Sequence, residues 1–329
     1  MPIVQQSTRT AVPTELDSRL EEHRRELTAY CYRMLGSVEA EDAVQETLLR
    51  AWRAFDRFEG RSSLRSWLYR IATNVCLDLL AGQERRARPM DLGPAREAVA
   101  ENLNELPEAT WIQPIPGGLV LPDGDPAEVA VARETLRLAF VAALQHLPPR
   151  QRAALILCEV LRWQASEVAE LLDTSVASVN SALQRARDTL AKSDLSGATV
   201  SPLDADDRAL LERYVSAFER YDLDALTMLI REDATQSMPP YDLWLRGRDD
   251  ILAWWFGPGI GCRGSRVIPA GTAGGVPSYG QYKPAAEGGY EPWALQVVEV
   301  SGGRIGEFTF FLDTATLFPR FGLPARLDG

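Results

Sequence analysis

Apolar residues recur at helical spacing over most of the first half of the chain and at strand-like spacing toward its end. The helical repeat covers residues from about 16 to 86 and from about 126 to 192. After residue 204, helical stretches at 206–221, 223–232 and 247–256 precede strand-like segments at 265–270, 278–283, 293–300 and 304–312. We expect a multidomain protein with two all-α domains and then an α+β domain. The predicted domains are 16–88, 126–192 and 204–329, joined by an acidic linker at 89–125 and a second linker at 193–203.

Composition adds limits on compartment and chemistry. Of the 329 residues, 46% are hydrophobic and 25% are charged, as in ordinary soluble proteins. The first 14 residues lack the apolar segment of a signal peptide, and no apolar run reaches the roughly 18 residues of a membrane span, so we expect a cytoplasmic protein. The four cysteines are scattered along the chain, which favours buried free thiols over a disulfide framework. The two histidines leave few ligands for a metal and few groups for histidine-based catalysis. We expect no metal site and no cofactor.

The charge distribution matters more than the net charge of -11. Residues 60–88 contain six arginines and two acids, whereas residues 89–135 contain nine acids and two arginines. The basic stretch could neutralise phosphates. The acidic stretch suits either a segment that enters channels built for nucleic acid or a solvated tether.

The stretch 39–58 predicts an amphipathic helix with two distinct faces. Its apolar stripe is Val44, Leu48, Trp52 and Phe55. On another face, Asp42, Gln45 and Glu46 form a compact patch suited to arginines of a partner helix, although a solvated helix face would show the same pattern.

The next helical stretch, 64–80, combines aromatic and basic residues. Its apolar stripe is Leu64, Leu68, Ile71, Val75 and Leu79. Trp67, Arg70 and Asn74 share a different face, with Arg65 and Tyr69 nearby. Aromatic rings that stack on bases beside arginines that neutralise phosphates suit single-stranded DNA. Alternatively, Trp67 and Tyr69 are core residues.

Residues 166–190 predict a helix-turn-helix, although other three-helix folds share this pattern. A short helix at 166–172 and a turn at 173–175 precede an inner stripe at Val176, Val179, Leu183, Ala186 and Leu190. The outward side chains are of the types that read base edges in the major groove or hold phosphates: Ser178, Asn180, Ser181, Gln184, Arg185 and Arg187.

These motifs together resemble the sigma-70 family of bacterial initiation factors, in its extracytoplasmic-function (ECF) subfamily. Residues 41–52 resemble conserved region 2.2, residues 62–80 resemble regions 2.3 and 2.4, and residues 148–192 resemble region 4. The tail segments 111–116, 137–146 and 318–324 are similar to the actinobacterial sigma-G type, which carries a SnoaL-like domain of the NTF2-like superfamily. Many ECF relatives have further arginines where this chain has Asn180 and Ala182, so the promoter sequence does not carry over.

The resemblance implies partners and site residues. Core RNA polymerase would bind through its β′ clamp helices and β flap, and promoter DNA at its -10 and -35 elements. The β′ clamp would contact Asp42, Gln45, Glu46 and Leu49; the -10 element Arg61, Arg65, Trp67, Arg70 and Asn74; and the -35 element Ser175, Ser178, Asn180, Ser181, Gln184, Arg185 and Arg187. Whether an anti-sigma factor binds is left open.

The C-terminal domain is expected to regulate the sigma domains and not to catalyse a reaction. No histidine follows residue 146, and Tyr214, Tyr241 and Asp242 alone suggest an acid or a phenol. Its many aromatics fit a core, the apolar segment 318–324 looks suited to docking, and the short second linker keeps the domain close to region 4. The alternatives are a stand-alone helix-turn-helix regulator with a ligand-sensing domain, or a small-molecule enzyme with a vestigial DNA-binding part.

Overall fold

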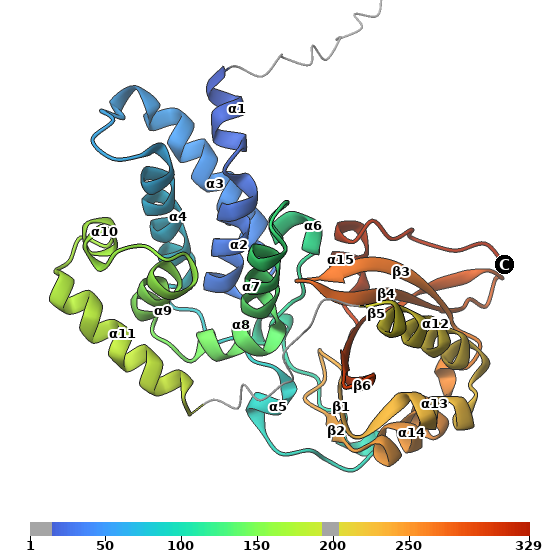
Figure 1. The fold of residues 1–329 in the computed structure, drawn as a ribbon. Coiled ribbons are helices and arrows are strands. Elements are labelled where there is room, and N and C mark those ends of the chain that lie inside the picture. Colours follow the sequence, from blue (N-terminus) through green and yellow to red (C-terminus); the bar gives the residue numbers. More distant parts are fainter. Residues whose placement is uncertain (1–14, 193–203) are drawn as a thin grey trace, which may run out of the picture.

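Three parts build the molecule, which we analysed as a computed structural model (Figure 1). The structure describes residues 15–192 and 204–329. The first 14 residues and the predicted linker at 193–203 lie outside the described residues. Two helical domains stand side by side, and the C-terminal domain packs beside them around a curved sheet.

The first helical domain is a bundle held by α2, α3 and α4. Its core includes the fully buried Leu27, Met34, Val44 and Leu68. The predicted apolar stripes are correct at their centres and wrong at two ends, because Trp52 is 54% exposed and Leu79 is 37% exposed. The elements are α1 (Glu15–Glu21), α2 (Arg24–Leu35), α3 (Glu39–Ala54), η1 (Phe55–Arg57) and α4 (Leu64–Leu80).

The second helical domain contains the expected helix-turn-helix and packs against the first. One contact between them is that of Trp163 with Tyr69, whose ring centroids lie 5.1 Å apart. Both rings are buried, so the two domains share one core. The elements are α7 (Pro126–Leu136), α8 (Leu138–Gln145), α9 (Pro149–Leu155), the π-helical η4 (Ile156–Val160), α10 (Ala165–Leu171) and α11 (Val176–Leu190).

The acidic segment 89–125 is packed against its neighbours and is not a solvated tether. Trp111, Ile112 and Ile115 are almost completely buried. Since residues of this kind stabilise by removal from water, the segment is held in place along much of its length. It contains α5 (Pro89–Leu92), η2 (Ala100–Asn102), η3 (Glu108–Thr110) and α6 (Gly117–Val120).

The C-terminal domain is an α+β fold with a six-stranded sheet in the order β2-β1-β6-β5-β4-β3. Strands β1 and β6 run parallel, and the other neighbours are antiparallel. Helices α12 to α14 lie along one side of the curved sheet (Figure 1). The elements are α12 (Ala205–Arg220), α13 (Leu223–Leu229), β1 (Ile230–Ser237), β2 (Trp244–Arg246), α14 (Arg248–Phe256), η5 (Pro258–Cys262), β3 (Arg266–Ala273), β4 (Val276–Pro284), β5 (Tyr290–Ser301), β6 (Arg304–Phe311) and α15 (Thr314–Arg320).

Two strands of this sheet were not predicted. The helix expected at 223–232 ends at Leu229, and β1 begins at Ile230. The charged residues Arg231, Glu232 and Asp233 continue the pattern of the preceding helix, but they belong to β1. Strand β1 pairs with β6, which follows about 70 residues later in the sequence. Tertiary pairing therefore overrides the local pattern.

The acidic segment contacts both edges of the sheet. At the β2 edge, the main-chain nitrogen of Arg96 donates to the oxygen of Trp244 at 3.1 Å, and Glu105 forms a bridge with Tyr241. At the β3 edge, Pro116 forms a bridge with Ala273. The segment thus connects the two helical domains in sequence and borders the third domain in space.

The outer face of the sheet belongs to the same apolar core as the helical domains. Val297, Phe311 and Phe318 join the cluster that also contains Ile112 and Leu136. Helix α15 reaches the first domain as well, because Arg320 lies 3.1 Å from Glu41 of α3. The segment 318–324 begins within α15. This helix packs on β5 and forms an ion pair with the first domain.

The helix-turn-helix lies away from the C-terminal domain. In Figure 1, α10 and α11 lie on the side of the helical domains opposite the sheet. The C-terminal domain instead contacts the early part of the second helical domain, where Arg137 pairs with Glu299 of β5. The expected closeness to region 4 applies to that start and not to the second helix of the motif. Among the described residues, no helix has the length and apolarity that crossing a membrane requires.

Candidate nucleic-acid and partner-protein interfaces

Helix α11 presents a row of polar and basic side chains to solvent. Its inner face is anchored by the buried Val179, Leu183 and Ala186. Val176, expected on the inner stripe, is 44% exposed, because the helix begins there and its first turn has no partner helix to cover it. All seven residues proposed for the -35 element are exposed: Ser175, Ser178, Asn180, Ser181, Gln184, Arg185 and Arg187.

The turn before α11 sets the orientation of this helix and of its exposed polar and basic side chains. Ser175 caps the helix, with its hydroxyl accepting from the main-chain nitrogen of Ser178 at 3.2 Å. Asp173 adopts a left-handed conformation in the turn, with φ of 51°. At the start of α10, the Glu167 carboxylate accepts from the main-chain nitrogen of Gln164 at 2.7 Å. Both helices are therefore held by local caps at the positions that a helix-turn-helix requires.

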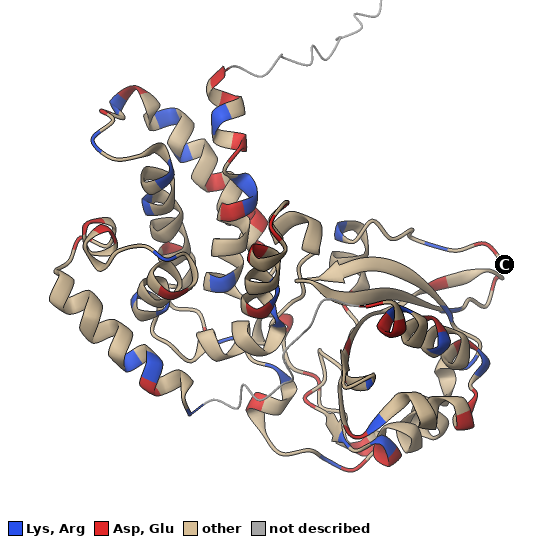
Figure 2. Ribbon diagram, viewed as in Figure 1, with Lys and Arg blue, Asp and Glu red and all other residues tan. Residues whose placement is uncertain are grey.

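Charge is concentrated near the end of α11. Figure 2 shows its first turns without charged side chains and its last turns with both signs. Gln184 donates to Asp188 at 3.0 Å, and Arg187 pairs with Glu159. A phosphate that reached Arg187 would have to compete with Glu159 for it.

The candidate -10 residues on α4 occupy two different environments. Asn74 is exposed, and Arg61, which precedes the helix, is 84% exposed and pairs with Glu59 at 2.8 Å. Trp67 is half-buried and packs on Phe58 with centroids 4.8 Å apart. Tyr69 is a core residue, buried against Tyr30 and Trp163, so the core alternative is correct for it.

Two arginines of α4 are engaged with neighbouring groups. Arg65 lies 2.7 Å from Glu26 and stacks over the rings of Tyr69 and Trp163 at 5.2 and 5.4 Å. Arg70 lies 3.5 Å from the Glu170 carboxylate of α10. Sequence reasoning missed Trp163, because an aromatic in a loop carries no helical periodicity. Part of the candidate -10 face is therefore occupied by the second helical domain.

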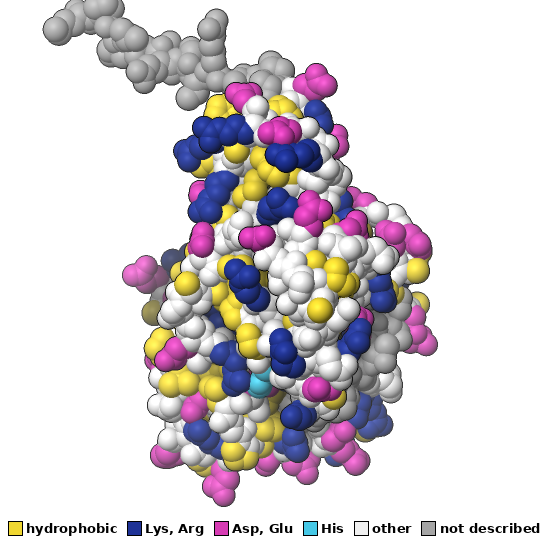
Figure 3. Space-filling view, turned by 90° about the vertical axis from the view of Figure 1, so that its left-hand side faces the viewer, with side chains coloured by type: hydrophobic (Ala, Val, Ile, Leu, Met, Phe, Trp, Pro, Cys, Tyr) yellow, Lys and Arg dark blue, Asp and Glu magenta, His cyan; other side chains and the backbone are white. Residues whose placement is uncertain are grey.

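The upper part of the molecule carries many basic side chains. Figure 3 shows Lys and Arg gathered there on the face that presents the left side of Figure 1. White atoms, which belong to the backbone and to side chains of other types, cover much of the middle of this face. Basic side chains gathered in this way suit a polyanion.

Helix α3 exposes a mixed acidic and apolar row. Asp42 and Gln45 are exposed, and Glu46 is half-buried with its carboxylate 2.7 Å from Arg50. Leu49 is 40% exposed and lies one turn from Trp52, which is the residue that the predicted inner stripe misplaced. An exposed apolar pair beside carboxylates is typical of a protein-binding surface.

The C-terminal domain directs its polar groups toward one another. Tyr214 is buried and donates to Gln296 at 2.8 Å, and burial raises its pKa well above the usual value. Asp242 pairs with Arg96 of the acidic segment at 2.8 Å. Gln296 in turn donates to Gln281 at 2.9 Å. Two of the three suggestive catalytic positions, Tyr214 and Asp242, are thus held in structural contacts. Within the described part of the chain, no group of three or more His, Cys, Asp or Glu could hold a metal ion.

Comparison with known proteins assigns all three parts. Family models match for Sigma-70 region 2 at residues 20–86, Sigma-70 region 4 at residues 137–190 and a SnoaL-like domain at residues 211–308. The ECF RNA polymerase sigma factor SigG of Mycobacterium tuberculosis is 45% identical over 321 residues, which cover 95% of this chain and 85% of that protein. The chain belongs to the ECF sigma factors.

Further relatives of this sigma factor agree with the assignment. SigW of Bacillus subtilis, also an ECF RNA polymerase sigma factor, is 31% identical over 163 residues, or 49% of this chain and 79% of that protein. The crystal structure of the Mycobacterium tuberculosis ECF sigma factor SigJ shares the fold, with a TM-score of 0.58 at 23% identity, over 94% of this chain and 99% of that one.

Family membership gives names to the parts of this sigma factor. The first helical domain is region 2, the second contains region 4, and the C-terminal domain is SnoaL-like. Sigma factors act in transcription initiation with RNA polymerase and DNA. A stand-alone helix-turn-helix regulator would leave the region 2 match unexplained, and that alternative is therefore set aside.

Proposed function

We propose that this sigma factor binds core RNA polymerase and directs promoter-specific initiation through three helices. The exposed row of α3, with Asp42, Gln45, Glu46 and Leu49, contacts the β′ clamp helices, and region 4 lies on the β flap. Carboxylates beside exposed apolar residues offer charge-assisted bonds to arginines and an apolar anchor to a partner helix.

Helix α11 reads the -35 element. The single observation that carries this proposal is its seven exposed polar and basic side chains over a buried inner face. Serine, asparagine, glutamine and arginine can bond base edges in the major groove, and arginine can also hold phosphates.

Helix α4 and its approach bind the -10 element during strand opening. Arg61 and Asn74 are already exposed, while Trp67 is half-buried. Arg65 and Arg70 must leave their contacts with Trp163 and Glu170 before they can reach DNA. Initiation by this route therefore requires regions 2 and 4 to separate, and the described arrangement is a closed one.

The SnoaL-like domain regulates the sigma domains and has no catalytic role. It touches region 2 through Arg320 and Glu41, the residue next to Asp42 of the polymerase-binding row. It also touches the start of region 4 through Glu299 and Arg137. Contacts with both regions allow the domain to favour one relative arrangement of them.

Run-off transcription with purified core polymerase tests the proposal. The template is the promoter upstream of the gene for this protein, and the expected result is a transcript that depends on the full-length chain. The matched control is the double variant Gln184→Ala/Arg185→Ala, which should keep polymerase binding and lose promoter choice. Absence of both a transcript and co-purification with core polymerase would show the proposal to be wrong.

A further inference from the structure

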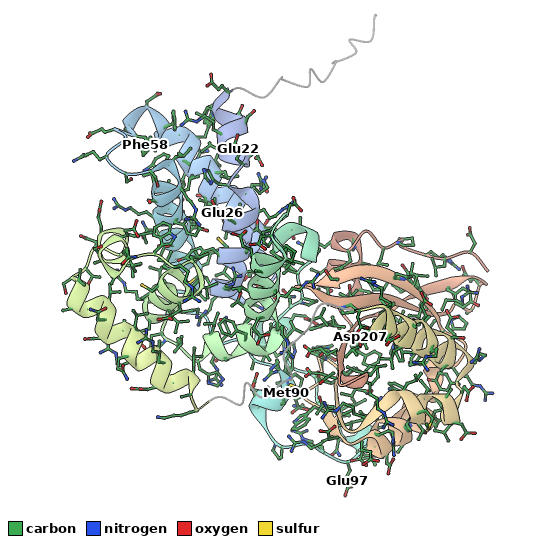
Figure 4. The ribbon with its side chains drawn as sticks, in the orientation of Figure 1. Glu22, Glu26, Phe58, Met90, Glu97 and Asp207 are labelled. Atoms are coloured by element: carbon green, nitrogen blue, oxygen red, sulfur yellow. The ribbon has the colours of Figure 1, made fainter. Side chains whose placement is uncertain are left out.

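A cleft of about 630 Å³ lies where region 2, the acidic segment and region 4 meet. Its walls come from α2, the end of α6, α7 and the residues that follow η4. A volume of this size is typical of small-molecule sites. Figure 4 shows Glu22 and Glu26, which line the cleft, near the start of α2. The proposed contacts with promoter and polymerase do not require a cleft here. They share one residue with it, Arg65 of its wall.

Arg33 is the notable residue of the cleft wall. Its side chain is only 3% exposed. Its Nε and Nη2 atoms donate to the hydroxyl of Thr135 at 3.2 and 2.7 Å. Across residues 15–192 and 204–329, no carboxylate pairs with this guanidinium. A neutral hydroxyl thus stands where a buried charge ordinarily has an anion.

The other buried arginines of the described chain have a carboxylate partner or several acceptors, although the Nε atom of Arg152 has no hydrogen-bond partner. Arg86 lies 2.9 Å from the Glu39 carboxylate, and Arg137 pairs with Glu299. Arg152 donates to three main-chain oxygens and one side-chain amide oxygen. Among the described residues neither Arg33 nor Arg152 pairs with a carboxylate, and Arg33 differs in that one hydroxyl is its acceptor where Arg152 has four.

Arg33 remains a cation under ordinary conditions. Burial lowers the pKa of Arg33 to about 10, which still leaves the group charged at neutral pH. A buried charge without a counterion is costly. An anion that enters the cleft would remove this cost.

The remaining charges of the cleft leave room for such an anion. Arg25 is paired with Asp123, and Arg65 with Glu26. Arg162 is exposed at the same cleft, in a left-handed backbone conformation with φ of 60°. Glu22 and Glu128 also line the cleft but are exposed at its rim. The positive end of the cleft is therefore its buried end.

Apolar side chains line the rest of the cleft. Val131 of α7 is 51% exposed, so its side chain is open to a ligand in the cleft. Val120, Ala132, Val160 and Leu161 complete the apolar wall. A ligand that fits has an apolar body and a charged head.

We propose that this cleft binds a small amphipathic anion, whose carboxylate or phosphate head accepts from Arg33 and whose apolar body lies against Val131 and Leu161. Such a ligand touches α2 of region 2 and both α7 and Leu161 of the second helical domain at once. Its binding therefore stabilises the closed arrangement by linkage, because the open arrangement separates these walls.

Calorimetry and thermal unfolding of the full-length protein test this inference with four probes. Octanoate and octyl phosphate should each bind and raise the unfolding midpoint, and the tighter of the two identifies the preferred head group. Octanol, which has the same apolar body without charge, and inorganic phosphate, which lacks the body, should bind at least ten-fold more weakly. Equal affinity for octanol and octanoate, or no binding of either amphiphile at millimolar concentration, overturns the inference.

Variants separate a ligand site from a structural arginine. Arg33→Met, of similar size, should weaken octanoate at least ten-fold and leave the ligand-free midpoint unchanged or higher. Thr135→Asp places a carboxylate beside Arg33, so it should raise the ligand-free midpoint and also weaken octanoate. Arg152→Met is the matched control, and it should lower the midpoint because four acceptors lose their donor. If Arg33→Met lowers the midpoint as far as Arg152→Met does, Arg33 is structural and the inference is wrong.

Discussion

Arg70 of α4 donates a 3.2 Å hydrogen bond to the main-chain oxygen of Glu170 in α10, and its guanidinium lies 3.5 Å from the Glu170 side chain. This contact joins a candidate -10 residue to the first helix of the -35 motif. Together with the packing of Trp163 on Tyr69 and Arg65, it holds regions 2 and 4 against each other. DNA that requires Arg70 must therefore compete with a contact inside the protein.

Removing the Glu170 side chain should favour the open arrangement. Exposed ion pairs contribute about 0.2–1 kcal/mol, so Glu170→Ala should strengthen binding to core polymerase or to single-stranded -10 DNA by up to about five-fold. Fluorescence anisotropy with labelled DNA measures the change. The control is Glu287→Ala, an exposed acid in a turn of the SnoaL-like domain that changes net charge equally. Equal effects of both variants would assign the gain to net charge alone.

Charge reversal on α3 should abolish polymerase binding without unfolding the protein. Asp42→Lys and Glu46→Lys alter exposed and half-exposed positions outside the buried stripe. Co-purification with core polymerase should be lost, while the circular dichroism spectrum stays unchanged. Asp224→Lys with Glu232→Lys, at exposed positions of the SnoaL-like domain, is the charge-matched control. Retained co-purification of the α3 variant would remove α3 from the polymerase interface.

Variants of α11 and α4 should fail at different steps of initiation. Gln184→Ala with Arg185→Ala should weaken -35 recognition by about 1–3 kcal/mol for each base that the native side chain binds in bidentate fashion. Asn74→Ala is the clean -10 variant, because Asn74 is exposed whereas Trp67 also packs on Phe58. Permanganate footprinting of the polymerase complex separates loss of binding from loss of strand opening. A common point of failure would contradict the proposed division between the two helices.

Stability should depend on pH through a half-buried acid between the domains. Glu307 of β6 is paired in register with Glu299 of β5, near Arg88 and Arg137. Burial, with Glu299 adding to it, raises the pKa of Glu307 to about 7, although the two arginines oppose the shift. The folded protein thus holds this proton more tightly than the unfolded chain does. The stabilisation of the folded state by this protonation is complete below the unfolded pKa of about 4.3, and it is lost as the pH rises to about 7.

Glu307→Gln should remove this dependence. Urea unfolding at pH 5 and pH 7.5 should give a smaller difference in the free energy of unfolding for the variant than for the wild type, by roughly 1–3 kcal/mol. Glu287→Gln, at an exposed acid, serves as the control and should keep the wild-type difference. Identical pH dependence in wild type and Glu307→Gln would show that the proton is held elsewhere.

A chain that ends at Lys192 should be less stable than the full-length protein. Its truncation exposes Ile112 and Leu136, which share a core with Val297 and Phe318. Differential scanning calorimetry should show a lower midpoint for regions 2 and 4 in the shortened chain. Phe318→Ala offers a milder version in the complete chain, at a cost of about 3–5 kcal/mol. An unchanged midpoint in both variants would mean that the SnoaL-like domain is only tethered.

Periodicity predicted the helices well where the buried face is set by local sequence. The inner residues Val179 and Leu183 of α11 and Val44 and Leu48 of α3 are buried as expected. Exposure at helix ends, as at Trp52, depends on which neighbours arrive and cannot be read from spacing.

Features set by distant partners were missed. Strand β1 depends on β6, and the closed contact depends on Trp163, which lies 94 positions from its ring partner Tyr69. The uncompensated charge of Arg33 was likewise invisible, because the sequence shows an arginine in a helix but not the absence of an acid around it. The exposed row of α11 could be predicted because it needs only the local helix and its cap.

The acidic segment borders both edges of the six-stranded sheet, with Arg96 and Glu105 at β2 and Pro116 at β3. Uncovered strand edges pair readily with other chains. Movement of this segment away from the sheet would expose the main-chain N–H and C=O groups of β2 and β3, and would favour self-association of the sigma factor. The segment therefore covers both edges of the sheet as well as connecting the two helical domains.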